Sequence, residues 1–494
     1  MRRLALLSVI FLLAFSACRK EVLTPVFTRS EVVSIPQEGG RFSVAVTYTK
    51  AEEYAGFSYR VNIGSALGRE ETVSGRVDEI AFDVPANETY ETRKVTLAVN
   101  TDRHWTVIFS AVQACMEKPV PPEPGIVPGT DPDDTWQSAA DAVTTMRVGW
   151  NLGNTLDANG DWIKQYGDGS TASYETAWGQ PVTKPELLKM FADAGFGAIR
   201  VPVTWYQHMD AAGKVDEAWM ARVEEVVNYV LDAGMYCVLN VHHDTGTEGW
   251  MKADAAIYQS TAGRFKGLWR QIAERFRDYG EKLVFEGYNE ILDASNYWNY
   301  PKSASAFEWS NKYNQDFVNV VRESGGNNSR RNLVCVTYCA GAGADNLAGF
   351  ELPADTVNGH LIAEVHSYAP YLFAFDFDDP KQGTSVFDAA AEKEIEWIIS
   401  CLKDRFTLRG IPCIIGEYGA ANKNNMTERC KQASCYVANA RAAGITCFHW
   451  MGLSDGADRS VPKWTEPALR DAILAAAGLR TSASPNARSR IGSS

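Results

Sequence analysis

The chain has few of the features that mark several large classes of protein. Its 48 lysines and arginines face 61 aspartates and glutamates, a net charge of −13, which argues against a partner with a phosphate backbone. No GxGxxG or P-loop pattern follows any predicted strand, which disfavours a nucleotide enzyme. The 10 cysteines lack companion histidines or cysteines at zinc-site spacing, so we predict no metal site and no defined disulfide framework.

An apolar run long enough to cross a membrane as a helix is also missing. The N-terminal run Leu4–Phe15 is too short to span a bilayer, and the two arginines before it are typical of an export signal. The run is followed by small residues and Cys18, an ending that resembles a bacterial lipobox, although Phe15 stands where leucine or valine is usual. We therefore expect a signal peptide over residues 1–18 and an outer-membrane lipoprotein anchored through Cys18, on the periplasmic or the cell-surface face. Ordinary secretion is the alternative.

Aromatic residues, in contrast, are abundant. The sequence holds 14 tryptophans and 20 tyrosines, and such flat amphipathic rings suit a ligand with apolar faces and polar edges, such as a sugar. Packing in the core is the alternative for most of them.

The first part of the chain has the pattern of a small all-β domain. After a predicted tether over residues 19–30, short apolar bursts separated by turn residues extend over residues 31–115, which indicates a β-sandwich. Six prolines between Glu117 and Asp134 then predict a semi-rigid linker over residues 116–135.

From Trp136 onward the pattern alternates between helix and strand. Helical segments repeatedly end in glycine, as at Gly195, Gly234 and Gly444, and each glycine precedes a nearly continuous apolar strand. Eight such strands over about 320 residues favour an α/β fold of the (β/α)8 TIM-barrel type over an open doubly wound sheet. We place this domain at residues 136–480 and expect the polar tail, residues 481–494, to be disordered.

Polar side chains stand at the ends of seven of the eight predicted strands. In a barrel of this kind the carboxyl ends of the strands build the site. In chain order these residues are Asn151, Asn154, Arg200, His242, His243, Asn289, Glu290, His366, Tyr368, Glu417, His449 and Trp450.

Two carboxylates flanking one glycosidic bond are what glycoside hydrolysis needs. The stretch LVFEGYNE supplies Glu290 at its end, and its partner is sought among Glu286, Glu364 and Glu417. Glu286 lies four residues before Glu290 on the same strand, about 13 Å away, which is too far, so it is predicted to be an interior charge paired with a cation. Glu364 lies two residues inside its strand and is also predicted to be interior. Glu417 ends the strand IIGE beside Gly416, where a ligand or backbone can approach, and is the predicted partner.

The motifs IRVPV, VHHD, GYNE, VHSY, GEYG and HW, in this order, resemble glycoside hydrolase family 5. GWNLGNTLDA and LVFEGYNE are most similar to its subfamily 4, which contains endo-β-1,4-glucanases and xyloglucanases. The resemblance implies a retaining mechanism with Glu290 as general acid/base and Glu417 as nucleophile, about 5–5.5 Å apart, without a cofactor. The segment SIPQEGGRFSVAV resembles the BACON module of secreted polysaccharide-degrading enzymes, but a tryptophan common in that module is missing, so we expect a spacer and not a sugar-binding domain.

The supporting roles follow from the same resemblance and from side-chain chemistry. Arg200 and Tyr368 are expected to hold Glu417 ionised and oriented, and Asn289 to bind the sugar 2-hydroxyl. The remaining residues expected to contact the cleaved sugar or its rim are His242, His243, His366, Trp450, Asn151 and Asn154.

Four further tryptophans are candidates to stack on sugar units. Trp178 and Trp298 lie in predicted loops, Trp205 follows a strand end, and Trp309 opens a helix and is more typical of the core. Asp157 and Asp244 are interpreted as loop or cap residues.

The most direct hypothesis is an endo-acting β-1,4-glucanase that acts on cellulose-like glucan or xyloglucan as a monomer. The alternatives are a β-mannanase or xylanase, and an inactive surface glycan-binding lipoprotein on the same scaffold.

Overall fold

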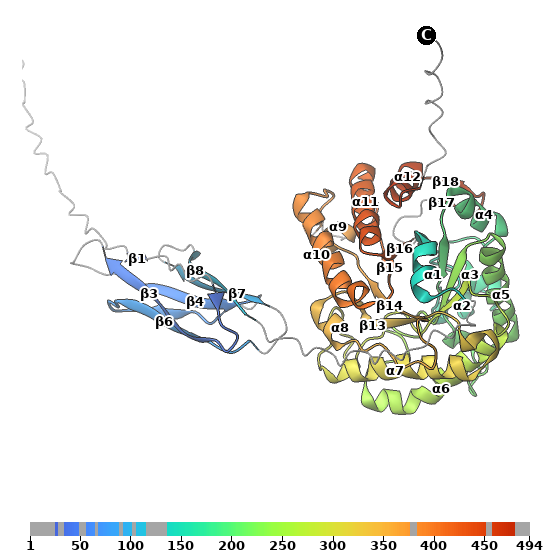
Figure 1. The fold of residues 1–494 in the computed structure, drawn as a ribbon, viewed down its shortest axis with the longest axis horizontal. Helices are drawn as coiled ribbons and strands as arrows, with labels where there is room; N and C mark the ends of the chain where they lie inside the picture. Colours follow the sequence, from blue (N-terminus) through green and yellow to red (C-terminus); the bar gives the residue numbers. More distant parts are fainter. Residues whose placement is uncertain are drawn as a thin grey trace, which may run out of the picture. The chain divides into compact units, whose positions relative to one another are not determined.

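The computed structural model describes residues 25–27, 34–48, 56–64, 68–87, 92–100, 105–114, 136–375, 383–450 and 457–479. The chain divides into two compact units, Met1–Ile126 and Val127–Ser494, drawn at the blue end and the green-to-red end of the colour scale in Figure 1. The predicted signal peptide, Cys18, the whole proline-rich linker and the C-terminal tail lie outside the described residues.

The first unit consists of two β-sheets around one core. Its strands are β1 (Pro25–Phe27), β2 (Ser34–Ile35), β3 (Gly40–Tyr48), β4 (Phe57–Ile63), β5 (Glu71–Val73), β6 (Glu79–Val84), β7 (Arg93–Asn100) and β8 (Trp105–Gln113). One sheet has the order β1-β3-β6 and the other β2-β8-β7-β4-β5. Buried side chains of both sheets, such as Phe82 and Phe109, pack in the same cluster, as an all-β sandwich requires.

One boundary of this unit differs from the prediction. β1 lies inside residues 19–30, the predicted tether, and pairs antiparallel with β3 from Pro25 opposite Tyr48 to Phe27 opposite Val46. The tether prediction is therefore wrong for these three residues. Only a short apolar segment is present there, and its strand conformation depends on a partner about 20 residues away, which a local pattern does not reveal.

The second unit is built on a closed barrel of eight parallel strands. They are β9 (Gly149–Asn151), β10 (Ala198–Val201), β11 (Tyr236–Asn240), β12 (Leu283–Glu286), β13 (Leu333–Gly341), β14 (Leu361–His366), β15 (Cys413–Tyr418) and β16 (Ile445–Trp450). The barrel order is β10-β11-β12-β13-β14-β15-β16-β9, and it closes where β9 pairs with β10. This confirms the predicted (β/α)8 fold and all eight predicted strands.

Helices surround the barrel (Figure 1). They are α1 (Ala139–Met146), α2 (Asp161–Tyr166), α3 (Thr171–Glu175), α4 (Pro185–Ala194), α5 (Glu217–Asp232), α6 (Ala255–Arg275), α7 (Ser305–Glu323), α8 (Ala344–Gly349), α9 (Tyr371–Ala374), α10 (Ala389–Arg405), α11 (Met426–Ala442) and α12 (Pro467–Ala476). Short 3-10 turns η1 (Tyr206–His208), η2 (Gly326–Ser329) and η3 (Thr407–Arg409), and a two-stranded ribbon of β17 (Ala457–Asp458) and β18 (Lys463–Trp464), complete the described part. Gly195 and Gly444 follow α4 and α11 with left-handed φ values of 112° and 73°, so they end these helices as predicted.

The barrel interior has an apolar floor below a charged layer. Helix α1 packs against inward side chains near the amino ends of the strands, including Val284 on β12 and Ile362 on β14. Side chains alternate along a strand, so the next inward positions on these two strands are Glu286 and Glu364. Both are buried completely, which confirms that they are interior carboxylates.

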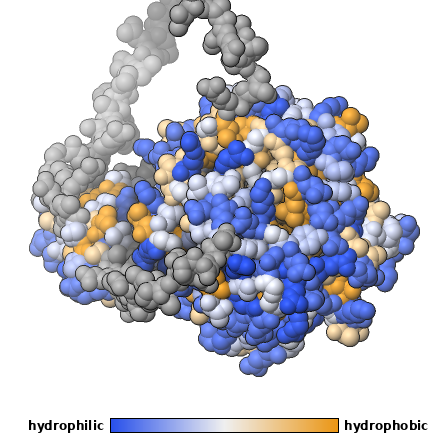
Figure 2. Space-filling view, turned by 45° about the vertical axis from the view of Figure 1, so that its right-hand side comes forward, coloured by the Kyte–Doolittle hydropathy of each residue, from blue (hydrophilic) through white to orange (hydrophobic). Residues whose placement is uncertain are grey.

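The described cysteines are all free, and five of them lie in barrel strands: Cys237, Cys335, Cys339, Cys413 and Cys447. Within the described part of the chain, no helix combines the length and the apolar character needed to cross a membrane. Figure 2 shows that the visible face is mostly hydrophilic and that its apolar side chains gather in separate patches.

Candidate active site

Arg200 lies at the centre of the charged layer. Its side chain, fully buried on β10, forms a two-pronged ion pair with Glu286, with Nε–Oε2 and Nη2–Oε1 distances of 2.7 Å. Nη1 donates to Oε1 of Glu417 over 2.7 Å and to Oδ1 of Asn151 over 3.0 Å. The planar guanidinium is thus fixed by Glu286 and presents one edge to Glu417.

Glu417, on β15, has a second donor. The phenol of Tyr368 donates to Oε2 over 2.7 Å, so each carboxylate oxygen accepts one strong hydrogen bond. Burial alone would raise the pKa of Glu417, but the charges of His366 and Arg200 and the two hydrogen bonds lower it below its usual range. Glu417 is therefore held as an oriented carboxylate.

Glu290 lies next to Glu417 at the rim of the barrel. β12 ends at Glu286, and the next four residues continue as a loop to Glu290, whose backbone N–H donates to Thr245 Oγ1 over 3.0 Å. Nδ1 of His366 lies 2.9 Å from Oε1 of Glu290 and 3.6 Å from Oε2 of Glu417. Carboxylate oxygens of Glu290 and Glu417 lie within 4.8 Å of each other.

The two glutamates have opposite pKa shifts. Burial is the largest influence on Glu290, and together with the nearby charge of Glu417 it outweighs His366 and raises the pKa. The Glu290 side chain is still 22% exposed, against 7% for Glu417. His366 is kept as a cation because its carboxylate neighbours outweigh burial and raise its pKa to about 10. One protonated and one ionised carboxyl group side by side are what acid-assisted nucleophilic substitution requires.

His242 and Trp450 form a flat wall next to these groups. Their rings are nearly parallel, at an interplanar angle of 5° and a centroid distance of 5.7 Å. Asn240 donates to Nδ1 of His242 over 3.0 Å and to Oε1 of Glu286 over 2.9 Å. Burial, followed by the charges around it, lowers the pKa of His242 well below its usual value, so the ring is neutral. Sequence reasoning missed Asn240, although it lies on the same strand face as His242, two positions earlier.

The predicted asparagines have different environments. Asn289 accepts from Arg200 Nη2 through Oδ1 over 2.8 Å, which leaves its NH2 group free to face a ligand. Asn151 donates to the Gly416 carbonyl over 2.9 Å and is fully buried, so it joins strands and orients Arg200. Asn154 has a left-handed φ of 59°, and its backbone N–H donates to Asp157 over 3.0 Å.

Two strand-end residues do not join the site as their sequence positions suggested. His449 is buried between the rings of Trp150 and Tyr418. Burial lowers its pKa to about 3, which makes it a neutral core residue. The space beside the Gly416 backbone is occupied by the Glu364 side chain, because a Cβ on Gly416 would come within 1.6 Å of a Glu364 oxygen. This glycine therefore makes room for Glu364 and not for a ligand.

The four tryptophans that are candidates for stacking on sugar differ in their exposure to solvent. Trp298 is 45% exposed in the loop after β12, and the ring of half-buried Trp178 contacts His243 at a centroid distance of 5.4 Å. Trp205 is fully buried, and its indole N–H donates to the Asn240 carbonyl over 3.0 Å, so the prediction that it stacks on sugar is wrong. Trp309 packs against the core, as its helical position suggested.

Two sets of three side chains bring possible metal-ligand atoms within 4.8 Å of one another in the described residues: Asp157, His242 and His243, and the catalytic candidates Glu290, His366 and Glu417. Asp157 already accepts from the backbone N–H groups of Asn154 and Thr155, and it is a buried loop residue as predicted. Internal hydrogen bonds and ion pairs account for the closeness of both sets, so we assign no metal ligands.

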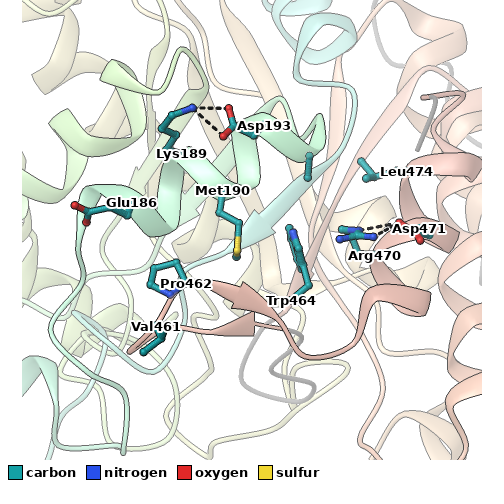
Figure 3. Close-up of a pocket in the computed structure, with 11 residues that line it drawn as sticks. Glu186, Lys189, Met190, Asp193, Val461, Pro462, Trp464, Arg470, Asp471 and Leu474 are labelled. Atoms are coloured by element: carbon teal, nitrogen blue, oxygen red, sulfur yellow. Dashed lines mark hydrogen bonds and ion pairs between the residues drawn. The ribbon is translucent and has the colours of Figure 1, made fainter. Parts of the chain in front are cut away.

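A separate hollow of about 450 Å³ lies outside the barrel, between α4, the β17–β18 ribbon and α12. Met190, Pro462 and Trp464 line it, and the ion pairs Lys189–Asp193 and Arg470–Asp471 flank it (Figure 3). Its lining includes none of the strand-end residues described above, so it adds nothing to the catalytic cluster.

Comparison with known proteins gives one consistent family. Residues 156–455 match the model of the cellulase family, glycosyl hydrolase family 5. The chain is 36% identical over 352 residues to endoglucanase A of Clostridium longisporum, covering 68% of this chain and 66% of that protein. It is 33% identical over 360 residues to the xyloglucan-specific endo-β-1,4-glucanase of Bacteroides ovatus, covering 70% of this chain and 69% of that protein.

Solved structures agree. A family 5 glycoside hydrolase of Prevotella bryantii B14, crystallised as a variant with a xyloglucan tetradecasaccharide, is 43% identical with a TM-score of 0.64, covering 69% of this chain and 99% of that one. A broad-specificity endoglucanase of subfamily 4 from Ruminococcus champanellensis, with bound cellotriose, is 38% identical with a TM-score of 0.64, covering 68% of this chain and 98% of that one.

Proposed function

The chain belongs to glycosyl hydrolase family 5, and on that premise we propose that it cleaves internal β-1,4-glucosidic bonds by double displacement on Glu290 and Glu417. That it is a glycoside hydrolase of the endoglucanase type follows from the family and from relatives that are endoglucanases.

One observation carries the mechanism: carboxylate oxygens of Glu290 and Glu417 lie within 4.8 Å of each other. Retaining glycosidases hold their two carboxyl groups about 5–5.5 Å apart, whereas inverting enzymes need about 6.5–9.5 Å to admit a water molecule. The short separation favours attack by Glu417 itself and retention of configuration.

In the first step a Glu417 oxygen forms a bond to the anomeric carbon, and the bond from that carbon to the leaving oxygen breaks. Glu290 transfers its proton to the leaving oxygen and becomes a carboxylate. In the second step Glu290 takes a proton from water, whose oxygen displaces Glu417 from the anomeric carbon. Both glutamates return to their starting states, so the cycle balances without a cofactor.

The neighbouring side chains favour the charged states of this cycle. Arg200 and Tyr368 hydrogen-bond the two oxygens of Glu417, which orients the nucleophile for attack. The free NH2 group of Asn289 is suited to bind the 2-hydroxyl of the reacting sugar, an interaction that strengthens in the transition state. The Trp450 ring gives that sugar an apolar surface.

For the substrate we propose cellulose-like glucan and xyloglucan. The support is that relatives are named as endoglucanases and one as xyloglucan-specific, and that a neighbour was crystallised with xyloglucan. A β-mannanase or xylanase shares the chemistry and differs in loop contacts. Initial rates on xyloglucan, mixed-linkage glucan, carboxymethyl cellulose, mannan and xylan decide between them: fastest hydrolysis of mannan or xylan would overturn the glucan assignment.

The variant Glu417→Gln tests the mechanism against the alternative of a non-catalytic glycan-binding protein. We expect a loss of at least about 10⁴-fold in kcat on a soluble β-glucan. The control is Asp355→Asn. The Asp355 side chain is 6% exposed and pairs with Arg322, and it lies in the segment before β14, at the end of the barrel opposite to Glu417. Full activity of Glu417→Gln on every glucan that the parent cleaves would overturn the proposal.

We also propose that the enzyme is tethered to the outer membrane through acylated Cys18 and that the all-β unit is a spacer. In the described residues of that unit, the exposed large apolar side chains are Val107 and Val112, which do not make an aromatic platform for sugars. Mass spectrometry of the membrane fraction is expected to find a triacylated Cys18 at the mature N-terminus, and a soluble chain cleaved elsewhere would contradict this.

A further inference from the structure

Glu364 is a buried carboxyl group that the mechanism above does not use. It lies on β14, two residues before His366, and its side chain has no exposure. Neither of its oxygens has a hydrogen-bond partner within the described residues. A buried carboxylate without such partners is costly, so its presence inside the charged layer calls for an explanation.

Two cations lie near one of its oxygens. Nε2 of His366 is 3.5 Å from Oε1, and Nε of Arg200 is 3.6 Å from it. Both distances suit a charge contact better than a strong hydrogen bond. Arg200 forms its short hydrogen bonds with Glu286, Glu417 and two asparagines, Asn151 and Asn289. His366 is therefore the cation that Glu364 can influence most.

The position of Glu364 is fixed by close packing. Gly416 on the neighbouring strand β15 has no side chain, and a Cβ there would overlap Oε1 of Glu364. The charged or titratable groups that face Glu364 come from five strands: Arg200 on β10, Glu286 on β12, Cys335 on β13, His366 on β14 and Cys413 on β15. Burial raises the pKa of both thiols, so they stay neutral.

The charges of this cluster balance only when Glu364 is neutral. Arg200 and His366 are cations, and Glu286 and Glu417 are carboxylates. In the proposed cycle, the Glu417 charge disappears in the ester as Glu290 gives up its proton, so the sum is unchanged. An ionised Glu364 adds one negative charge behind His366, while His366 bonds Glu290 on its other side through Nδ1.

We propose that Glu364 is a positioning residue that supports His366 from behind and, by passing from its neutral to its ionised form, extends the pH range over which Glu290 keeps its transferable proton. This inference rests on the proposed role of Glu290. Burial and the nearby Glu286 raise the pKa of Glu364 to about 7, so the change from the neutral to the ionised form takes place near neutral pH. A new negative charge keeps His366 protonated and makes Glu290 release its proton at higher pH.

The test is the pH profile of kcat/KM for Glu364→Gln, which removes the charge and keeps the shape. We expect the alkaline limb to move to lower pH by roughly half a unit to one unit, and the acidic limb to stay in place because Glu364 is already neutral there. Glu364→Asp retains a carboxyl group and is expected to recover part of the shift. Asp355→Asn is the control and is expected to move neither limb.

If Glu364 has only a structural role, the pH profile of Glu364→Gln is different. The substitution then lowers the rate equally at every pH and leaves both limbs where they are, and that outcome, or an equal shift in Asp355→Asn, would overturn the inference. Failure of the proposed function is seen separately, as retained activity in Glu290→Gln.

A second measurement does not depend on activity or on the folding of Glu364→Gln. In Glu290→Gln, infrared difference spectra between about pH 6 and about pH 9 are expected to show a carboxylic-acid C=O band that disappears at the higher pH, as for a group titrating near neutrality. Absence of this band at the lower pH would also overturn the inference.

Discussion

Glu286 and Glu417 share the guanidinium group of Arg200. Glu286 takes two of its nitrogens at 2.7 Å, and Glu417 takes the third at 2.7 Å. The first carboxylate anchors the arginine from below, and the arginine in turn anchors the second carboxylate at the rim. The geometry of the proposed nucleophile therefore depends on a residue one layer deeper in the barrel.

Arg200→Lys tests this dependence. Lysine keeps the positive charge but cannot bridge two carboxylates with a planar fork. We expect kcat/KM to fall about 100-fold or more, and the acidic limb of the pH profile to move to higher pH because Glu417 is less well stabilised as a carboxylate. Stability is expected to fall as well, since Glu286 is left poorly paired. A variant with parental kcat/KM and acidic limb would contradict the role of Arg200.

Tyr368→Phe removes a single hydrogen bond to Glu417. Bonds to a charged group contribute about 1.5–3 kcal/mol, so kcat/KM is expected to fall about 10- to 100-fold, again with the acidic limb displaced to higher pH. Tyr166→Phe is the matched control, because Tyr166 is 78% exposed on α2. Equal losses in the two variants would show that the phenol of Tyr368 has no particular role.

The pH dependence of the parent enzyme follows from the opposite shifts of the two glutamates. In the proposed mechanism Glu417 must be ionised, and its lowered pKa keeps it so to more acidic pH than usual. Glu290 must be protonated, and its raised pKa keeps it so to higher pH than usual. We expect a broad bell-shaped profile of kcat/KM. Activity falls on the acidic limb as Glu417 becomes protonated, and it falls on the alkaline limb as Glu290 ionises. With a substrate whose leaving group needs no proton, the alkaline limb is expected to disappear from the pH profile of the first step, because that step no longer needs the proton of Glu290.

Trp298→Ala tests the loop after β12 as a surface for the polymer. An exposed tryptophan in the loop that carries the proposed acid/base can stack on a sugar unit, so we expect KM on polymeric glucan to rise about 5- to 20-fold with a smaller change in kcat. Trp397 on α10 is 54% exposed and gives the control Trp397→Ala, for which parental kinetics are expected. If both variants have the same KM, Trp298 is not part of the binding surface.

The barrel fold follows from local patterns in the sequence, and so do parts of the site. The barrel and the interior placement of Glu286 and Glu364 were predictable, because alternation along a strand and helix-stopping glycines are local signals. The hydrogen bonds of Arg200 and Tyr368 with Glu417 were predictable once the strand ends were known to meet.

Burial at the strand ends was not predictable in the same way. Trp205 follows β10 but turns into the protein, since side-chain direction after a strand depends on loop packing that no local pattern encodes. His449 and Trp450 are neighbours inside β16, so their side chains point to opposite faces of the strand, and His449 is on the face turned away from the site. Asn240 went unnoticed because an amide inside a strand resembles any other polar residue until its partners, His242 and Glu286, are seen.

The most direct test of the account is to identify the residue that carries the glycosyl intermediate. An activated 2-deoxy-2-fluoro-β-cellobioside slows both chemical steps, and peptide mass spectrometry then locates the trapped sugar. We predict that the label is on Glu417 and is absent from Glu417→Gln. A label on Glu290, or on another residue of an active enzyme, would contradict the two-glutamate assignment.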